Sequence, residues 1–184
     1  MTGSAAVQRV LRALRKQTRH DPRDDLVRIV VQARAHDACE YCLLPTAGRF
    51  EIDHVVPPAV WDAYRRGTLA VRPWRVLTRG PDHLDNFVWS CPFCNSSKAQ
   101  QVDAPVGRTR IRLFNPRRDR WPRHFLLVRH YLFIKPLTPI GEATEHALGF
   151  NQPRLYGSLS TRHILIATGG DYPPPFARAW ADRR

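Results

Sequence analysis

The stretch EIDHVV at residues 51–56 places an acid beside an imidazole within an apolar, β-branched run. A Cys-x-x-Cys pair lies on each side of it, Cys39/Cys42 before and Cys91/Cys94 after. An isolated Asp-His pair is more often structural than catalytic. An imidazole, with its ordinary pKa of about 6.5, is nevertheless the natural general base for water near neutral pH.

The four cysteines predict a metal site. Two disulfides would require an oxidising compartment, and the N-terminus has no hydrophobic segment of the signal-peptide type. Four thiolates in two such pairs match a tetrahedral structural zinc site, with disulfide or redox chemistry as the alternative. Zinc held by Cys39, Cys42, Cys91 and Cys94 has no open position for water, so its expected effect is to hold the chain between the pairs in place.

Three further polar residues would be positioned by that site. Asp53 is a hard oxygen ligand suited to Mg²⁺ or Mn²⁺, and Asn95, directly after the last cysteine, offers a second oxygen. Asn86 lies between the cysteine pairs. Neighbours on a flat strand point to opposite faces, so Asp53 and His54 can serve one phosphate only if the strand twists or ends before Pro57.

Local patterns predict the elements that carry these residues. We expect a helix that starts within 21–25, a strand over 48–58, a second strand over 83–91, and a helix over 95–101 capped by Asn95 or Ser96. Residues 59–82 form a polar and aromatic insertion with a short helix near its start. Strand, strand and helix with zinc at their ends make a small α+β core.

CEYC, FEIDHVVP and DNFVWSCPFCNSSKA, within about 39–100, resemble the HNH endonucleases, the zinc-stapled branch of the ββα-metal nucleases. The segments RLFNPRRDRWPRHF and LTPIGEATEHALGFN resemble the extension that follows the motif in many bacterial HNH proteins. The resemblance implies these roles: His54 as general base, Asn86 as brace of the hairpin, Asp53 and Asn95 as ligands of a catalytic Mg²⁺ or Mn²⁺, and Lys98 as a contact to phosphate. The implied activity is hydrolysis of DNA phosphodiester bonds, nicking by a monomer or double-strand cutting by a possible homodimer.

The charge of the chain favours a polyanionic partner. Its formal net charge is +13, carried mostly by arginine, which suits bidentate contacts to phosphate. The alternative is a basic surface that only solubilises the protein. Arginines alternate along an expected strand and then cluster beside aromatic residues, and we expect this group to grip a DNA backbone: Arg108, Arg110, Arg112, Arg117, Arg118 and Arg120.

The expected organisation has four parts. They are a basic amphipathic arm over 1–20, a nuclease domain with the zinc site over 21–106, a basic α/β extension over 107–170, and a poorly ordered tail over 171–184. In the extension, FLLVRHYLFI predicts two strands around a tight turn, and Thr138 with Pro139 predicts a helix start. No apolar run is long enough to cross a bilayer. Because the N-terminus has no hydrophobic segment of the signal-peptide type, we expect a cytoplasmic protein. The alternative function is a non-catalytic zinc-knuckle module that binds nucleic acid.

Overall fold

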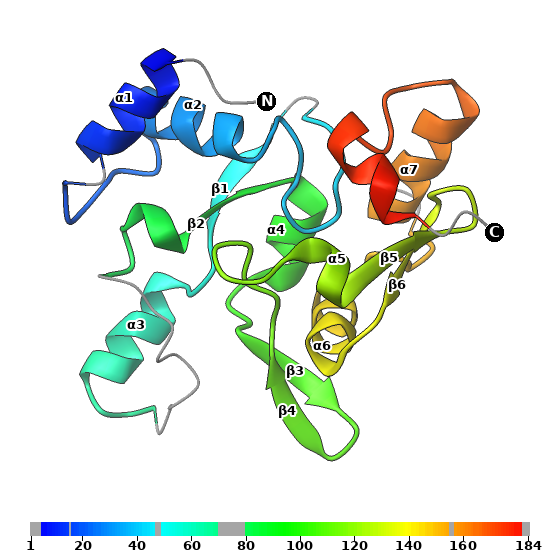
Figure 1. Cartoon of the computed structure of the whole chain (residues 1–184). Helices are drawn as coiled ribbons and strands as arrows, with labels where there is room; N and C mark the ends of the chain where they lie inside the picture. The colour runs from blue at the N-terminus through cyan, green and yellow to red at the C-terminus, as the bar shows by residue number, and fades with distance from the viewer. Residues whose placement is uncertain (1–4, 15, 47–48, 70–79, 155–156, 182–184) are drawn as a thin grey trace.

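The computed structural model describes residues 5–14, 16–46, 49–69, 80–154 and 157–181. Short helices alternate with three two-stranded antiparallel sheets in this part of the chain, so the fold is mixed α and β (Figure 1). The elements are α1 (Ala5–Leu14), α2 (Asp25–Arg34), β1 (Glu51–His54), α3 (Pro58–Arg65), η1 (Leu84–Asn86), β2 (Phe87–Ser90), α4 (Pro92–Lys98), β3 (Asp103–Val106), β4 (Thr109–Arg112), α5 (Trp121–His124), β5 (Phe125–Val128), β6 (Phe133–Pro136), α6 (Pro139–Leu148), α7 (Ser158–Ala167) and η2 (Pro175–Trp180).

The strand, strand and helix that sequence patterns predict lie at the centre of the molecule. β1 pairs antiparallel with β2, so that Asp53 lies opposite Val88 and His54 opposite Phe87. β1 ends at His54, just before the prolines. This strand end meets the condition under which Asp53 and His54 can serve the same phosphate. α4 follows β2 directly, which places the helix against the same hairpin (Figure 1).

The start of α4 differs from the prediction. The helix begins at Pro92, not at Asn95 or Ser96, and Cys91 is its N-cap. The Cys91 sulfur accepts a hydrogen bond from the backbone N–H of Cys94 at 3.4 Å. Proline suits the first helical position because it has no N–H to satisfy there. Asn95 therefore lies within the helix.

The N-terminal helices form as the sequence indicates. α2 begins at Asp25, and Asp24 caps it by accepting hydrogen bonds from the N–H groups of Leu26 and Val27. Its buried face carries valines at positions 27, 30 and 31. The predicted short helix after β1 is α3, and residues 70–79 of the same insertion lie outside the described residues.

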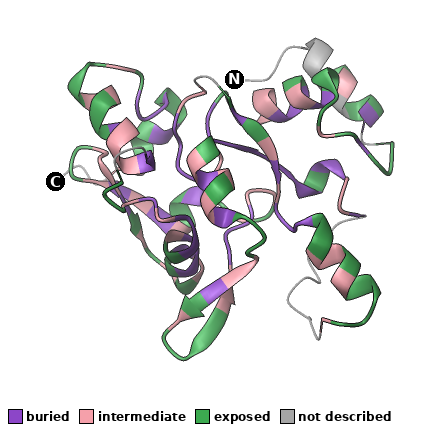
Figure 2. Cartoon of the chain, turned by 180° about the vertical axis from the view of Figure 1, so that it is seen from behind, coloured by how far each residue is buried: buried purple, intermediate pink, exposed green. Residues whose placement is uncertain are grey.

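The expected boundary at 106/107 falls in the turn of a hairpin. β3 pairs with β4, with Val106 opposite Thr109, and Gly107 in the turn has a positive φ of 58°. α6 packs against both strands and against α4. One cluster of buried apolar residues extends from Leu14 to Ala177, so the arm, the central unit and the extension share a core (Figure 2).

The extension contains the predicted strand pair and helix. β5 and β6 pair across the turn at 129–132, and α6 begins at Pro139, where the Thr138 hydroxyl accepts the N–H of Gly141 at 3.2 Å. Gly141 is required by close packing, because a Cβ there would lie 2.4 Å from the backbone oxygen of His124.

The expectation of a poorly ordered tail is wrong for residues 171–181. Tyr172 and Ala177 are buried, and the ring of Trp180 stacks on Trp121 with centroids 5.4 Å apart. The aromatic residues on both sides of the prolines at 173–175 supply apolar surface that a prediction from composition alone overlooks. None of the helices in the described ranges combines the length and the apolar character needed to cross a membrane.

Candidate metal centre and active site

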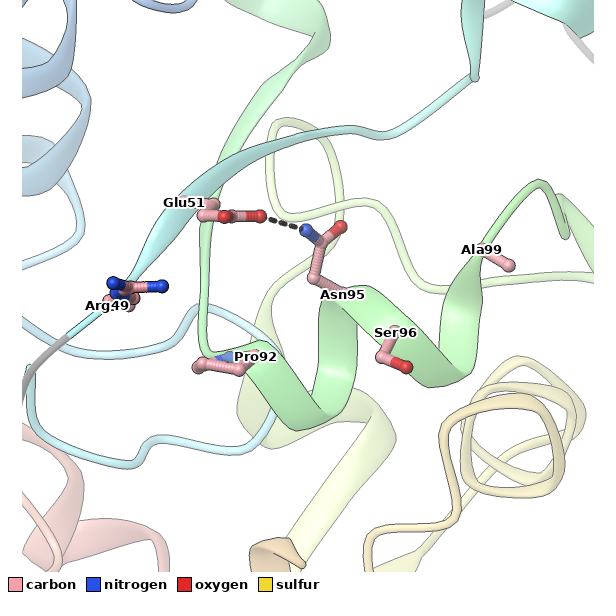
Figure 3. A pocket seen from close by; sticks show the side chains of 6 residues that line it. All are labelled: Arg49, Glu51, Pro92, Asn95, Ser96 and Ala99. Carbon is pink, nitrogen blue, oxygen red and sulfur yellow. Dashed lines mark hydrogen bonds between the residues drawn. The ribbon is translucent and has the colours of Figure 1, made fainter.

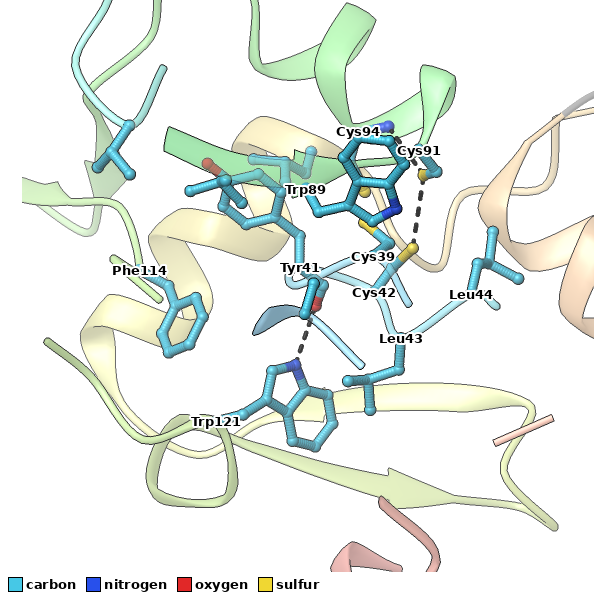
Figure 4. Packing of buried hydrophobic residues seen from close by; sticks show 14 of the residues in the cluster. Cys39, Tyr41, Cys42, Leu43, Leu44, Trp89, Cys91, Cys94, Phe114 and Trp121 are labelled. Carbon is cyan, nitrogen blue, oxygen red and sulfur yellow. Dashed lines mark hydrogen bonds between the residues drawn. The ribbon is translucent and has the colours of Figure 1, made fainter. Parts of the chain in front are cut away.

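The two cysteine pairs converge on one point where β2 ends and α4 begins. Their sulfur atoms all lie within 4.8 Å of one another, and all four residues are buried (Figure 4). The sulfurs of Cys42 and Cys91 are 3.6 Å apart. Zinc with four Zn–S bonds of about 2.3 Å sets sulfurs roughly 3.8 Å apart. The cluster therefore could hold a metal such as zinc, and it is the only such group of Cys, His, Asp or Glu among the described residues.

Backbone geometry explains why the first pair points inward. The N–H of Cys39 donates to the backbone oxygen of Leu44 at 2.7 Å, and the N–H of Leu43 donates back to Cys39 at 2.9 Å, with Leu43 in a positive-φ turn. Burial raises the pKa of the Cys94 thiol, because a lone thiolate is poorly solvated there. A bound cation would favour the thiolate forms.

Asp53 is a buried carboxylate with two partners. The Tyr41 hydroxyl donates to one oxygen at 2.8 Å, and the Lys98 ammonium lies 3.1 Å from the carboxylate. Burial raises the pKa of the Asp53 carboxyl, while Lys98 and Tyr41 act in the opposite direction. The Asp53 carboxylate therefore already has a positive charge beside it, the Lys98 ammonium.

Lys98 does not have the surface position expected of a phosphate contact. Its side chain is 1% exposed, and its ammonium also donates to the backbone oxygen of His54 at 2.7 Å. This corrects the prediction, because a cation buried between α4 and β1 compensates Asp53 instead of facing solvent. No local pattern distinguishes the two roles.

The His54 ring lies in a partly enclosed position next to β2. It contacts Phe87 edge to face with ring centroids 5.1 Å apart, and its side chain is 17% exposed. The Nε2 atom is buried and lies 3.6 Å from an Asp82 carboxylate oxygen. Burial lowers the pKa of His54, whereas the negative charges of Asp53 and Asp82 raise it. A lowered pKa keeps the imidazole neutral, the form a general base needs.

Asn86 ties the end of the first strand to the start of the second. Its amide oxygen accepts the N–H of Val56 at 2.9 Å, and its amide nitrogen donates to the backbone oxygens of Val56 and Pro81, both at 2.8 Å. Asn86 is fully buried, so removing it would leave buried backbone groups unsatisfied. These bonds fix the chain just after His54.

Asn95 faces an open groove of about 450 Å³, lined by Arg49, Glu51, Pro92, Asn95, Ser96 and Ala99 (Figure 3). Its amide nitrogen donates to a Glu51 oxygen at 2.8 Å. The Asn95 oxygen accepts no hydrogen bond from the described residues, so it can accept one or coordinate an ion. Asp53 does not line this groove, so the two predicted ion ligands lie on adjoining elements with different partners.

Glu51 is a further acidic residue of the candidate site that was not among the predicted site residues. It lies two residues before Asp53 on β1, and alternation along a strand puts both on the same side. Its carboxylate is exposed and contacts Asn95. The acidic alternation in EID is the signal that could have identified it.

The arginines expected to contact DNA fall into two groups. Arg112 makes two hydrogen bonds to Asp119, Arg117 pairs with Glu40 from the first cysteine segment, and Arg110 pairs with Asp103 across the β3–β4 hairpin. Arg112 and Arg117 are therefore used inside the fold, which departs from the prediction. The exposed members with no ion pair among the described residues are Arg108, Arg118 and Arg120.

Comparison of the chain with protein-family models, with curated proteins and with solved structures found no match. A functional interpretation consequently depends on the residues and their geometry.

The cysteine cluster leads to a prediction about folding. Cys94→Ser should unfold the central unit, because a structural zinc contributes its binding free energy to folding. Elemental analysis of the wild-type protein should give about one tightly held zinc per chain. A folded Cys94→Ser variant, or wild-type protein folded without metal, would contradict a structural zinc site.

A second prediction concerns the buried ion pair. Lys98→Met should lower the free energy of unfolding by about 3–5 kcal/mol, because it leaves the Asp53 carboxylate buried without its cation. Lys135→Met, on the exposed side of β6, should change it by less than about 0.5 kcal/mol. Urea denaturation measures both, and equal effects would mean that the Asp53–Lys98 contact is not important for stability.

Proposed function

We propose that the chain is a metal-dependent endonuclease of the HNH type that hydrolyses DNA phosphodiester bonds. One observation carries the proposal: the β1–β2–α4 unit, closed by four buried cysteines, presents Asp53 and His54 at a strand end and Asn95 on the helix. The net charge of +13 suits a phosphate backbone. A module that only binds nucleic acid needs no imidazole enclosed beside a carboxylate.

His54 would act as the general base. It would take a proton from a water molecule, and the resulting hydroxide would attack the scissile phosphorus. The bond from phosphorus to the 3′ oxygen would break, and its electron pair would leave with that oxygen. The partly enclosed ring and the lowered pKa support this role, because the imidazole must be neutral before it accepts a proton. Asn86 would keep the strand end, and so the ring, in place through its bonds to Val56.

The donors available for a catalytic ion are hard oxygens, which suit Mg²⁺ or Mn²⁺. Asp53 and Asn95 would hold the ion, and the free amide oxygen of Asn95 supports its part. The Lys98 ammonium already lies beside the Asp53 carboxylate. The carboxylate must therefore exchange this partner for the metal ion. The ion would supply stabilisation of the negative charge on the phosphate and the leaving oxygen.

One observation favours the alternative, a zinc-knuckle module that binds nucleic acid without cutting it. Asp53 is enclosed by Tyr41 and Lys98, as in a purely structural polar cluster. Under this alternative Asp53 and Lys98 would only stabilise the fold. Charge and zinc content would be the same in both cases, so only a test of cleavage distinguishes them.

Removal of the imidazole tests the proposed function. His54→Ala should lower the rate of plasmid nicking with Mn²⁺ by about 10²–10⁴-fold, because it deletes the general base. DNA affinity and the thermal midpoint should stay close to those of wild type, since no zinc ligand changes. His163→Ala, at an exposed position of α7, is the matched control. A His54→Ala rate within threefold of wild type would remove His54 from the mechanism, and a wild type without nicking activity would favour the binding module.

A fourth prediction concerns the exposed arginines. Replacing Arg108, Arg118 and Arg120 together by Gln should weaken DNA binding equally across sequences, because phosphate contacts carry no sequence information. The slope of log affinity against log salt should flatten by about 0.9 for each lost contact.

The control for this prediction removes the same charge elsewhere, by Arg129, Arg154 and Arg178→Gln, all exposed positions. Affinities measured at several salt concentrations compare the two triple variants. Equal slopes for both would mean that binding responds only to net charge.

A further inference from the structure

We propose that Asp82 is the positioning residue of the general base. Its carboxylate would hold the His54 ring so that Nε2 faces Asp82 and Nδ1 faces the water to be activated. This inference rests on the proposed function, because His54 needs positioning for proton transfer only if the chain is a nuclease.

The two ring nitrogens of His54 have different surroundings. Nε2 is buried, and it lies 3.6 Å from an Asp82 carboxylate oxygen. This separation is longer than a normal hydrogen bond, and a shift of a few tenths of an ångström would make it a charge-assisted one. Nδ1 is not among the buried ring nitrogens that lack a partner, and it makes no hydrogen bond to the described residues. It is therefore the nitrogen open to solvent.

Asp82 is itself held from two sides. Its backbone oxygen accepts the N–H of His20 at 2.8 Å, and its second carboxylate oxygen accepts a hydrogen bond from Arg19 at 3.2 Å. The preceding residue, Pro81, is tied to Asn86 by the amide bond at 2.8 Å. One carboxylate oxygen thus faces Arg19 while the other faces His54.

A carboxylate at this place has a definite effect on the imidazole. A neutral imidazole has one N–H donor and one acceptor nitrogen, and the partner of one nitrogen sets the state of the other. An ionised carboxylate only accepts hydrogen bonds, so Nε2 would carry the hydrogen. The lone pair then lies on Nδ1, where it can take the proton when the O–H bond of water breaks. The hydroxide oxygen bonds to phosphorus as the bond from phosphorus to the 3′ oxygen breaks, and the electron pair leaves with that oxygen.

Asp82 could not be predicted from the sequence, because it ends an insertion with no matching motif and is 28 positions from His54 in the chain. Asp85, in the same PDHLD segment, is a natural comparison. Its side chain is 56% exposed and lies 3.4 Å from the ring of His83, not of His54. Asp82 lies in the turn before η1 and Asp85 within η1, and the two aspartates lie beside different histidines.

The tautomer of His54 can be measured directly by ¹⁵N NMR of the intact protein, without DNA. We expect the Nε2–H form in wild type and a mixture of the two tautomers in Asp82→Asn, with Asp85→Asn unchanged. A wild-type His54 in the Nδ1–H form, or the same tautomer mixture in wild type and Asp82→Asn, would overturn the proposal.

Cleavage kinetics supply the second readout. Asp82→Asn should lower kcat at least 10-fold, a part of the general-base contribution, with KM for plasmid DNA unchanged, and Asp85→Asn should stay within twofold of wild type. Asp82→Asn added to His54→Ala should cause no further loss, because residues that act as a unit are not additive. An equal further loss would show that Asp82 acts elsewhere and would overturn the proposal.

The two proposals fail in different ways. If His54→Ala cuts normally, the role of His54 in the proposed function fails, and the NMR measurement still decides whether Asp82 sets the tautomer. If His54→Ala is inactive while Asp82→Asn keeps both the wild-type tautomer and the wild-type kcat, only the role of Asp82 is wrong.

Discussion

The convergence of four cysteine sulfurs on one point is the constraint on which the rest of the structure depends. It joins the turn at 39–42 to the end of β2 and the first turn of α4. The antiparallel register of β1 and β2 then decides which residues lie opposite Val88 and Phe87, namely Asp53 and His54. A metal at this point would hold the chemistry-bearing side chains in place without touching any of them.

A partly buried ion pair and an indole hydrogen bond attach the basic extension to this central unit. Arg117 pairs with Glu40, which lies between Cys39 and Cys42 and also accepts the N–H of Trp89 at 2.9 Å. The indole nitrogen of Trp121 donates to the backbone oxygen of Tyr41 at 2.9 Å (Figure 4). The segment predicted to bind DNA therefore uses some of its arginine and aromatic residues to hold the extension on the cysteine segment.

Local signals predicted much of the fold and the cysteine cluster. Cysteine spacing, the proline end of β1, the Asp24 cap and the Thr138–Pro139 helix start each act within a few residues. The roles of Lys98 and Arg117 could not be predicted, because their partners Asp53 and Glu40 lie far away in the chain. Glu51 and Asp82 were missed for related reasons: one looked like an exposed strand residue, and the other lies outside every motif.

The central claim, that four thiolates hold one zinc ion, is tested most directly by X-ray absorption at the zinc edge on the purified full-length protein. The arrangement of Cys39, Cys42, Cys91 and Cys94 predicts four sulfur neighbours at about 2.3 Å and no oxygen or nitrogen in the first coordination sphere. A mixed sphere with nitrogen or oxygen ligands near 2.0 Å, or a folded protein that contains no zinc, would contradict it.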